Sequence, residues 1–174
     1  MFKVSVWRYG VKIKTLAATI ILCTAIVTRA HSFGVGAQFN FSTGEIFAPG
    51  AALVISPSDM THLAVNWYLD FDNVNIIGLT LDMCPVMLQI ADFNAGSFNF
   101  TLGAGLFATM VFADDRGFNG GLRIPVGLNI LMARKVFEIY GHVAPSFGVH
   151  FLPSLKLSSQ PFFPTAIGIR LWFR

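Results

Sequence analysis

Large apolar side chains alternate with small or polar ones along most of the chain beyond residue 32. Within 63–72 the odd positions from Leu63 to Phe71 are all large and apolar, whereas the even positions are small, polar or acidic apart from Tyr68. The same alternation recurs over 33–41, 77–83, 98–106, 122–130 and 167–174. A period of two places one set of side chains on each face of a β-strand, so the pattern predicts a chain built of strands.

Turn-forming residues divide this pattern into eight predicted strands. Clusters of Gly, Pro, Asn, Asp and Ser separate the apolar runs, for example at 42–45, 56–59 and 92–96. The second strand is the least regular, because its apolar residues fall on both faces. The predicted strands cover 33–42, 49–56, 62–72, 75–89, 97–112, 120–132, 136–151 and 162–174.

The two faces of these strands differ from those of a soluble protein. Alternation alone also suits a soluble sandwich with a dry core. Here, however, the polar face carries mostly Gly, Asn and Thr, rather than the dense Lys and Glu cover of a water-facing surface. From residue 31 onward no run of 18 apolar residues provides a transmembrane helix. An apolar face against lipid and a polar face around a lumen account for both observations.

Strands cross a bilayer only as a closed barrel, because an open edge leaves amide groups unpaired in hydrocarbon. Eight is the smallest even strand number that closes such a barrel. The predicted fold class is therefore all-β, an eight-stranded antiparallel transmembrane β-barrel. An even number of strands also places the first and the last strand's free ends, the two termini of the barrel, on the periplasmic side of the membrane.

Composition agrees with this prediction. The chain has 174 residues, which suits one domain, and 54% of them are hydrophobic while 12% are charged. That charged share is about half of what soluble domains carry, which argues against an ordinary cytosolic enzyme. The mean hydropathy of +0.63 would usually indicate transmembrane helices. In this chain the apolar residues are instead spread over every second position.

The first 30 residues have the features of a cleavable signal peptide. Residues 1–14 carry four positive charges, and 15–27 form an uncharged apolar run that leads to Ala30. We predict a signal peptide over 1–30, cleaved after Ala30 or Ser32, and a barrel over 31–174. The alternative is an N-terminal membrane anchor, although the run of 13 residues is shorter than the ~20 that a span needs.

The net charge of +3 comes from this leader. The first 30 residues hold five basic and no acidic side chains, whereas 7 basic and 9 acidic ones follow. The barrel is therefore slightly acidic, and no nucleic-acid partner is expected. Export past the inner membrane predicts an outer-membrane location, with membrane lipid as the surrounding partner.

Four segments carry a family resemblance: 102–105 (LGAG), 121–128 (GLRIPVGL), 137–145 (FEIYGHVAP) and 166–170 (AIGIR). With them the chain resembles small spirochaetal outer-membrane barrels, grouped loosely with the OmpW and opacity-protein superfamily. The resemblance covers 100–174 well and 33–99 only in pattern. It implies an outer-membrane barrel inserted by the barrel-assembly machinery and, from OmpW-like relatives, passage of small hydrophobic solutes. Such barrels often end on Phe, whereas here Arg174 follows Phe173.

A few charged side chains fall on the predicted lumen face and form the candidate site. Because an unpaired buried charge is expensive, we expect them to form a network. Glu138 and Arg170 lie on neighbouring strands near the same end and are predicted to pair, and Arg123 is predicted to meet Asp70. The network either fills and rigidifies the barrel or forms a solute-selective constriction. Its predicted members are Asp70, Asp82, Arg123, Glu138, His142 and Arg170.

Pro85, Pro125 and Pro145 fall inside predicted strands, where each removes an N–H from the ladder. They either end pairing near a rim or mark a weak seam in the wall, through which an apolar solute leaves sideways.

Catalysis, metal binding and cofactors are not expected. His142, His150 and Ser154 are the nearest approach to a hydrolytic site, but no acid is placed to orient them. The four His are scattered without metal-ligand spacing. Two functional hypotheses remain: binding or passage of small hydrophobic solutes, or a structural or host-interaction barrel with a plugged lumen and no transport.

Overall fold

The computed structural model of the chain describes residues 32–41, 49–69, 75–112, 117–152, 155–157 and 162–173. The predicted signal peptide, the predicted network member Asp70 and Ser154 lie outside these residues. Among the described residues, no helix has the length and apolar character of a membrane span. The strands belong to the compact unit Ser32–Arg174.

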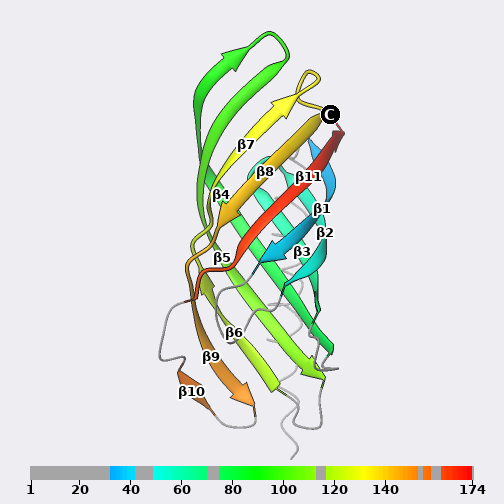
Figure 1. Cartoon of the computed structure of the whole chain (residues 1–174). Coiled ribbons are helices and arrows are strands. Elements are labelled where there is room, and N and C mark those ends of the chain that lie inside the picture. The colour runs from blue at the N-terminus through cyan, green and yellow to red at the C-terminus, as the bar shows by residue number, and fades with distance from the viewer. Residues whose placement is uncertain are drawn as a thin grey trace, which may run out of the picture. The chain divides into compact units, whose positions relative to one another are not determined.

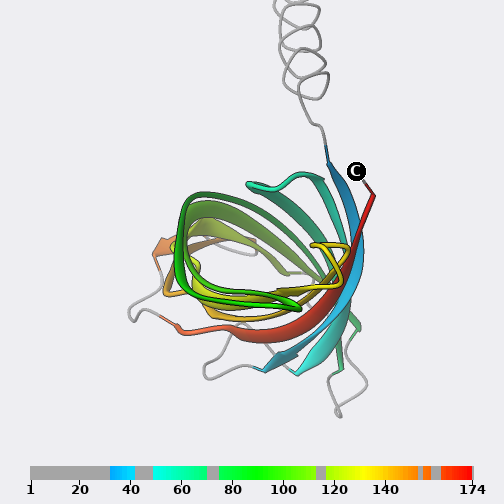
Figure 2. The ribbon, with the colours of Figure 1, turned by 90° about the horizontal axis from the view of Figure 1, so that it is seen from above.

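One antiparallel sheet closes on itself (Figures 1 and 2). Two pairings complete the ring. The first strand, β1, pairs with β2 and also with the last strand, β11, and β5 pairs with β6 and also with β7. The predicted all-β barrel is confirmed. The strands are β1 (Phe33–Phe41), β2 (Gly50–Ser58), β3 (Thr61–Leu69), β4 (Asn75–Phe93), β5 (Gly96–Phe112), β6 (Gly117–Arg123), β7 (Val126–Met132), β8 (Phe137–Val143), β9 (Ser146–Leu152), β10 (Lys156–Leu157) and β11 (Thr165–Phe173).

The wall has eight strands, because two of them are interrupted and each appears as two segments, and because the two-residue β10, which pairs with β9, is not one of the eight. β6 and β7 follow one another along the wall and are separated at Pro125, and β8 and β9 are separated at Pro145. The two interrupted strands keep the same register across the interruption, with β6 against β9 and β7 against β8, and the register shifts once, between Phe118 and Asn119. The strands predicted over 120–132 and 136–151 are therefore each divided by a residue that has no N–H to give to a ladder.

Side chains alternate between an exposed outer face and a buried inner face. Asn66 on β3 is 1% exposed, while its neighbour Trp67 is 63% exposed. β11 behaves in the same way, with Arg170 and Trp172 buried and Ile169 and Leu171 exposed. Polar residues inside and large apolar residues outside reverse the arrangement of a soluble protein. An apolar outer face of this kind is typical of a barrel whose wall meets lipid.

The β4–β5 hairpin extends well past its neighbour β3. Pairing of β3 with β4 ends at Thr61 and Met83, but β4 continues to Phe93, paired with β5 (Figure 1). This strand was predicted to end at residue 89. We call the rim at which β1 begins and β11 ends the terminal rim; the hairpin projects at this rim.

Candidate functional site in the barrel interior

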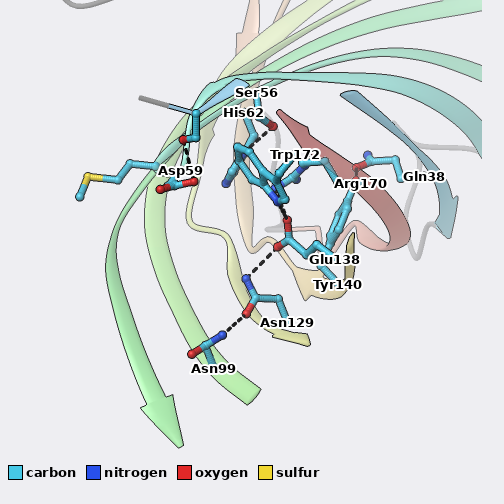
Figure 3. A network of polar contacts seen from close by, with 12 residues as sticks. Gln38, Ser56, Asp59, His62, Asn99, Asn129, Glu138, Tyr140, Arg170 and Trp172 are labelled. Atoms are coloured by element: carbon cyan, nitrogen blue, oxygen red, sulfur yellow. Dashed lines mark hydrogen bonds and ion pairs between the residues drawn. The ribbon is translucent and has the colours of Figure 1, made fainter. Parts of the chain in front are cut away.

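Glu138 is the centre of a buried polar cluster near the terminal rim (Figure 3). Arg170 stands directly opposite it on β11, and its Nη1 lies 3.0 Å from Glu138 Oε2. Trp172 Nε1 donates to the same oxygen at 2.7 Å, and Asn129 Nδ2 donates to Oε1 at 2.7 Å. Glu138 and Arg170 are 3% and 4% exposed. Both carboxylate oxygens therefore have partners, which offsets much of the cost of burying the charge.

Arg170 is also held by aromatic rings. Its guanidinium carbon lies 4.5 Å from the ring centroid of Tyr140 and 5.2 Å from that of Trp172, both within the range of cation–π attraction. The opposing strand makes room for it, since a Cβ at Gly34 would lie 2.9 Å from Arg170 Cδ. The ion pair, the rings and the absent side chain together fix this arginine across the lumen.

Amide side chains extend the cluster around the wall. Asn99 Nδ2 donates to Asn129 Oδ1 at 2.8 Å, which links β5 to Glu138 (Figure 3). On the other side, Tyr140 Oη donates to Gln38 Oε1 at 2.9 Å. Gln38 then donates to Asn40, and Asn40 to Asn66, at 2.8 and 2.9 Å. The sequence analysis did not include these amides among the site residues. The signal that could have indicated them is their place on the inward-facing positions of the alternating pattern.

A second ion pair lies farther from the terminal rim. Arg123 Nε is 3.1 Å from Asp82 Oδ1, and both side chains are buried. Arg123 Nη2 lies 3.0 Å from His142 Nε2. Because a guanidinium only donates, that ring nitrogen is the acceptor and carries no proton. The partner predicted for Arg123 was Asp70, which is not described; within the described residues its ionic partner is Asp82.

Ser56 and His62 form a further buried contact that the sequence did not indicate. Ser56 Oγ lies 2.9 Å from His62 Nδ1, the kind of contact that activates a nucleophile (Figure 3). Ser56, however, is 0% exposed. A substrate has no access to its hydroxyl, so the pair serves packing. Among the described residues, His, Cys, Asp and Glu form no cluster of three suited to a metal ion.

A buried cluster of mostly aromatic side chains lies in the part of the lumen away from the terminal rim. Tyr68, Ile76, Phe107 and Phe162 form a buried cluster, with Val111 packed against it. The rings of Phe107 and Phe162 meet edge to face at 5.4 Å. Phe162 precedes β11 and is held by paired backbone hydrogen bonds with Ser146, at 2.9 and 3.2 Å. The sequence placed residue 162 in a strand and did not indicate this inward anchor.

The cavity among the polar side chains of the lumen is small. A cavity of about 40 Å³ is lined by Asp82, Cys84, His142 and Arg170 among others. This volume accommodates about three water molecules. A separate hollow of about 90 Å³ lies near the terminal rim, beside Lys135.

The wall remains hydrogen-bonded at the prolines that were considered for a seam. The carbonyl of Pro125 accepts from Gly103 N at 2.9 Å, and that of Pro145 accepts from Ile124 N at 2.9 Å. Pro85 lies in a bulge of β4 beside the start of β3, where Cys84 N donates to Met60 O at 2.7 Å. Pro125 and Pro145 thus each interrupt a strand, and Pro85 lies in a bulge of a continuous strand; beside each proline a backbone hydrogen bond joins its strand to the neighbouring one.

No family model and no curated protein matches the chain. Among solved structures, it is similar to the N-terminal β-barrel domain of Pseudomonas aeruginosa OprF, with 13% identity and a TM-score of 0.42 over 83% of this chain and 98% of that one. It is also similar to a major outer membrane protein from Thermus thermophilus, with 10% identity and a TM-score of 0.39 over 82% and 98% of the two chains. Identities this low identify no family.

Proposed function

We propose that the protein is an outer-membrane β-barrel with a closed lumen and a structural role in that membrane. The observation that carries the proposal is the filled interior. The Glu138 cluster lies in the lumen near the terminal rim, and the buried cluster around Phe107 lies farther from that rim. The cavity beside Asp82, Glu138 and His142 has a volume of only about 40 Å³. An eight-stranded barrel is just wide enough for its own side chains to fill.

The membrane location rests on the outer face. Strands such as β11 present alternating large apolar side chains outward, and the wall closes without a free edge between β1 and β11. A closed ladder and an apolar exterior are what the hydrocarbon region requires. The predicted signal peptide adds the export that an outer-membrane protein needs. Membrane lipid and the barrel-assembly machinery are the partners that follow from this proposal.

Passage of small hydrophobic solutes is the function that the OmpW-like resemblance implied. It requires a path through the lumen or the wall. The layers inside the described barrel, and the backbone bonds beside Pro125 and Pro145, favour the closed alternative instead. Catalysis is not part of the proposal, because the Ser56–His62 contact is sealed from solutes.

Reconstitution into liposomes tests the proposal. We expect no swelling with small sugars, no conductance steps in planar bilayers and no protein-dependent uptake of an apolar fluorescent probe. Insertion is checked by the shift of the unheated band on gel electrophoresis, and an open porin in the same liposomes provides the positive control. Sugar-dependent swelling, or probe uptake that changes in a Pro125→Val and Pro145→Val variant, would overturn the closed-barrel proposal.

A further inference from the structure

Two glycines of the wall, Gly141 and Gly120, face outward. Gly141 lies between Tyr140 and His142, whose side chains point inward. For a Cβ built on Gly141, the nearest side-chain atom would be Cγ1 of Ile167, at 3.8 Å. Gly120 adjoins the exposed ring of Phe151. On an outer face made of large apolar side chains, each glycine leaves a gap.

The register around Gly141 shows what surrounds the first gap. Leu128 on β7 and Ile167 on β11 lie directly opposite Gly141 on its two sides, and Phe100 on β5 continues the row. These four strands are neighbours in the wall (Figure 1). Val143 follows Gly141 on the same face of β8. The resulting hollow has a volume of about 490 Å³ and an apolar lining.

The second hollow repeats this arrangement. Ala108 on β5 and Gly120 on β6 stand directly opposite each other, so two small residues adjoin. Leu79 and Val149 continue the row on either side. The hollow has a volume of about 530 Å³, and its lining includes Leu81, Leu106, Phe118, Leu122 and Phe151.

We infer that each hollow seats an acyl chain of a membrane lipid. The inference rests on the proposed membrane location and adds specific lipid sites to it. Both hollows open sideways on the face that meets hydrocarbon, and their exposed walls, such as Leu128, Ile167 and Leu122, are continuous with that face. A chain lying in such a hollow gains dispersion contacts along its floor and sides, which an empty hollow would forfeit.

The linings favour methylene groups over a polar ligand. Among the described residues, no Asp, Glu, Lys or Arg lines either hollow. Thr165 beside Val143 already donates its hydroxyl to the carbonyl of Phe163, at 3.4 Å. His142 touches the first hollow from inside the wall, and its Nε2 is engaged by Arg123. A compact solute with hydrogen-bonding groups would find few partners for them here.

Filling the hollows tests the inference. A Cβ at Gly141 would meet nothing closer than 3.7 Å, so Gly141→Leu fits the wall and occupies the first hollow. Ala108→Leu occupies the second. Ala37→Leu is the matched control, because Ala37 faces outward between Leu53 and Ile169 and lines neither hollow.

Each protein is reconstituted in dioleoylphosphatidylcholine vesicles, extracted in mild detergent and examined by native mass spectrometry. We expect the wild type and Ala37→Leu to retain two phospholipids, each filling variant one, and the double variant none. A phospholipid with a diazirine in its tail should label peptides that contain Leu128 or Ile167, and this labelling should be lost in Gly141→Leu.

Equal lipid counts in all variants would overturn the inference, as would labelling that Gly141→Leu leaves unchanged. Cross-linking of two barrels through these positions would identify a second copy as the occupant and would also overturn it. The heat-modifiable gel shift of every variant is recorded in parallel. If the wild type fails to insert into vesicles, the membrane location itself fails; if it inserts without retaining lipid, only the acyl-chain sites fail.

Discussion

Arg123 on β6 and Asp82 on β4 form an ion pair at 3.1 Å, although β5 lies between their strands. Gly105 on β5 stands opposite both residues in the ladder. The two outer strands are roughly 10 Å apart, so the arginine side chain must cross the middle strand. Because Gly105 has no side chain, Asp82 Oδ1 can lie directly above it, so close that it would clash with a Cβ at this position.

Gly105→Ala is expected to destabilise the barrel by about 3 kcal/mol, because a methyl group there displaces the carboxylate and breaks a buried ion pair. Urea unfolding from lipid vesicles measures the change. Gly141→Ala is the matched control, since its Cβ has room and its stability should change by less than about 1 kcal/mol. Equal stabilities of the two variants would contradict this account of Gly105.

Glu138→Ala is expected to cost about 3–5 kcal/mol, because it leaves the buried Arg170 without its ionic partner and frees the donors of Asn129 and Trp172. Glu138→Gln keeps the shape and one acceptor, so the loss should be smaller. In a double variant with Arg170→Met the cation left without its partner is removed, and stability should recover in part relative to Glu138→Ala. Additive losses, measured by the same unfolding assay, would show that the two residues are not coupled.

Ile169→Arg tests whether the outer face meets hydrocarbon. Ile169 is exposed on β11, between Ala37 and Ile139. An arginine near the middle of the bilayer should destabilise the barrel by about 2–4 kcal/mol. Met60→Arg is the comparison, because Met60 is equally exposed but lies in the β2–β3 turn at the terminal rim, where the effect should be below about 1 kcal/mol. Similar effects at the two positions, in vesicle refolding, would argue against the proposed membrane location.

The β7–β8 turn has a backbone conformation that invites a stabilising substitution. Ala133, Arg134 and Lys135 have φ values of 50°, 56° and 68°, in the left-handed region that costs a residue with a Cβ about 1–2 kcal/mol. Arg134→Gly should therefore raise the free energy of unfolding by roughly 1 kcal/mol. Arg134→Ala, which retains the Cβ, should leave it unchanged. A loss of stability in the glycine variant would mean that the arginine side chain itself holds the turn.

The alternation of large apolar and small or polar residues was sufficient to predict which side chains face inward. This is a local property, because the pleat of a strand sends successive side chains to opposite faces. Strand number followed in the same way from the turn residues between runs. Even the contact of Glu138 with Arg170 required only that their two strands be neighbours, since both residues lie near the same rim.

The partners of Arg123, Tyr140 and Phe107 were decided by the tertiary structure. Each of these contacts joins strands whose relative register depends on how the whole sheet closes, and a shift of one residue would exchange the two faces of a strand. The same closure brings Phe162 into the lumen and leaves the outer hollows at Gly141 and Gly120. The sequence by itself determined the two faces of the wall, because the alternation of apolar and polar side chains is a property of consecutive residues. Only the closed sheet decided what fills the lumen, because that depends on distances between strands far apart in the sequence.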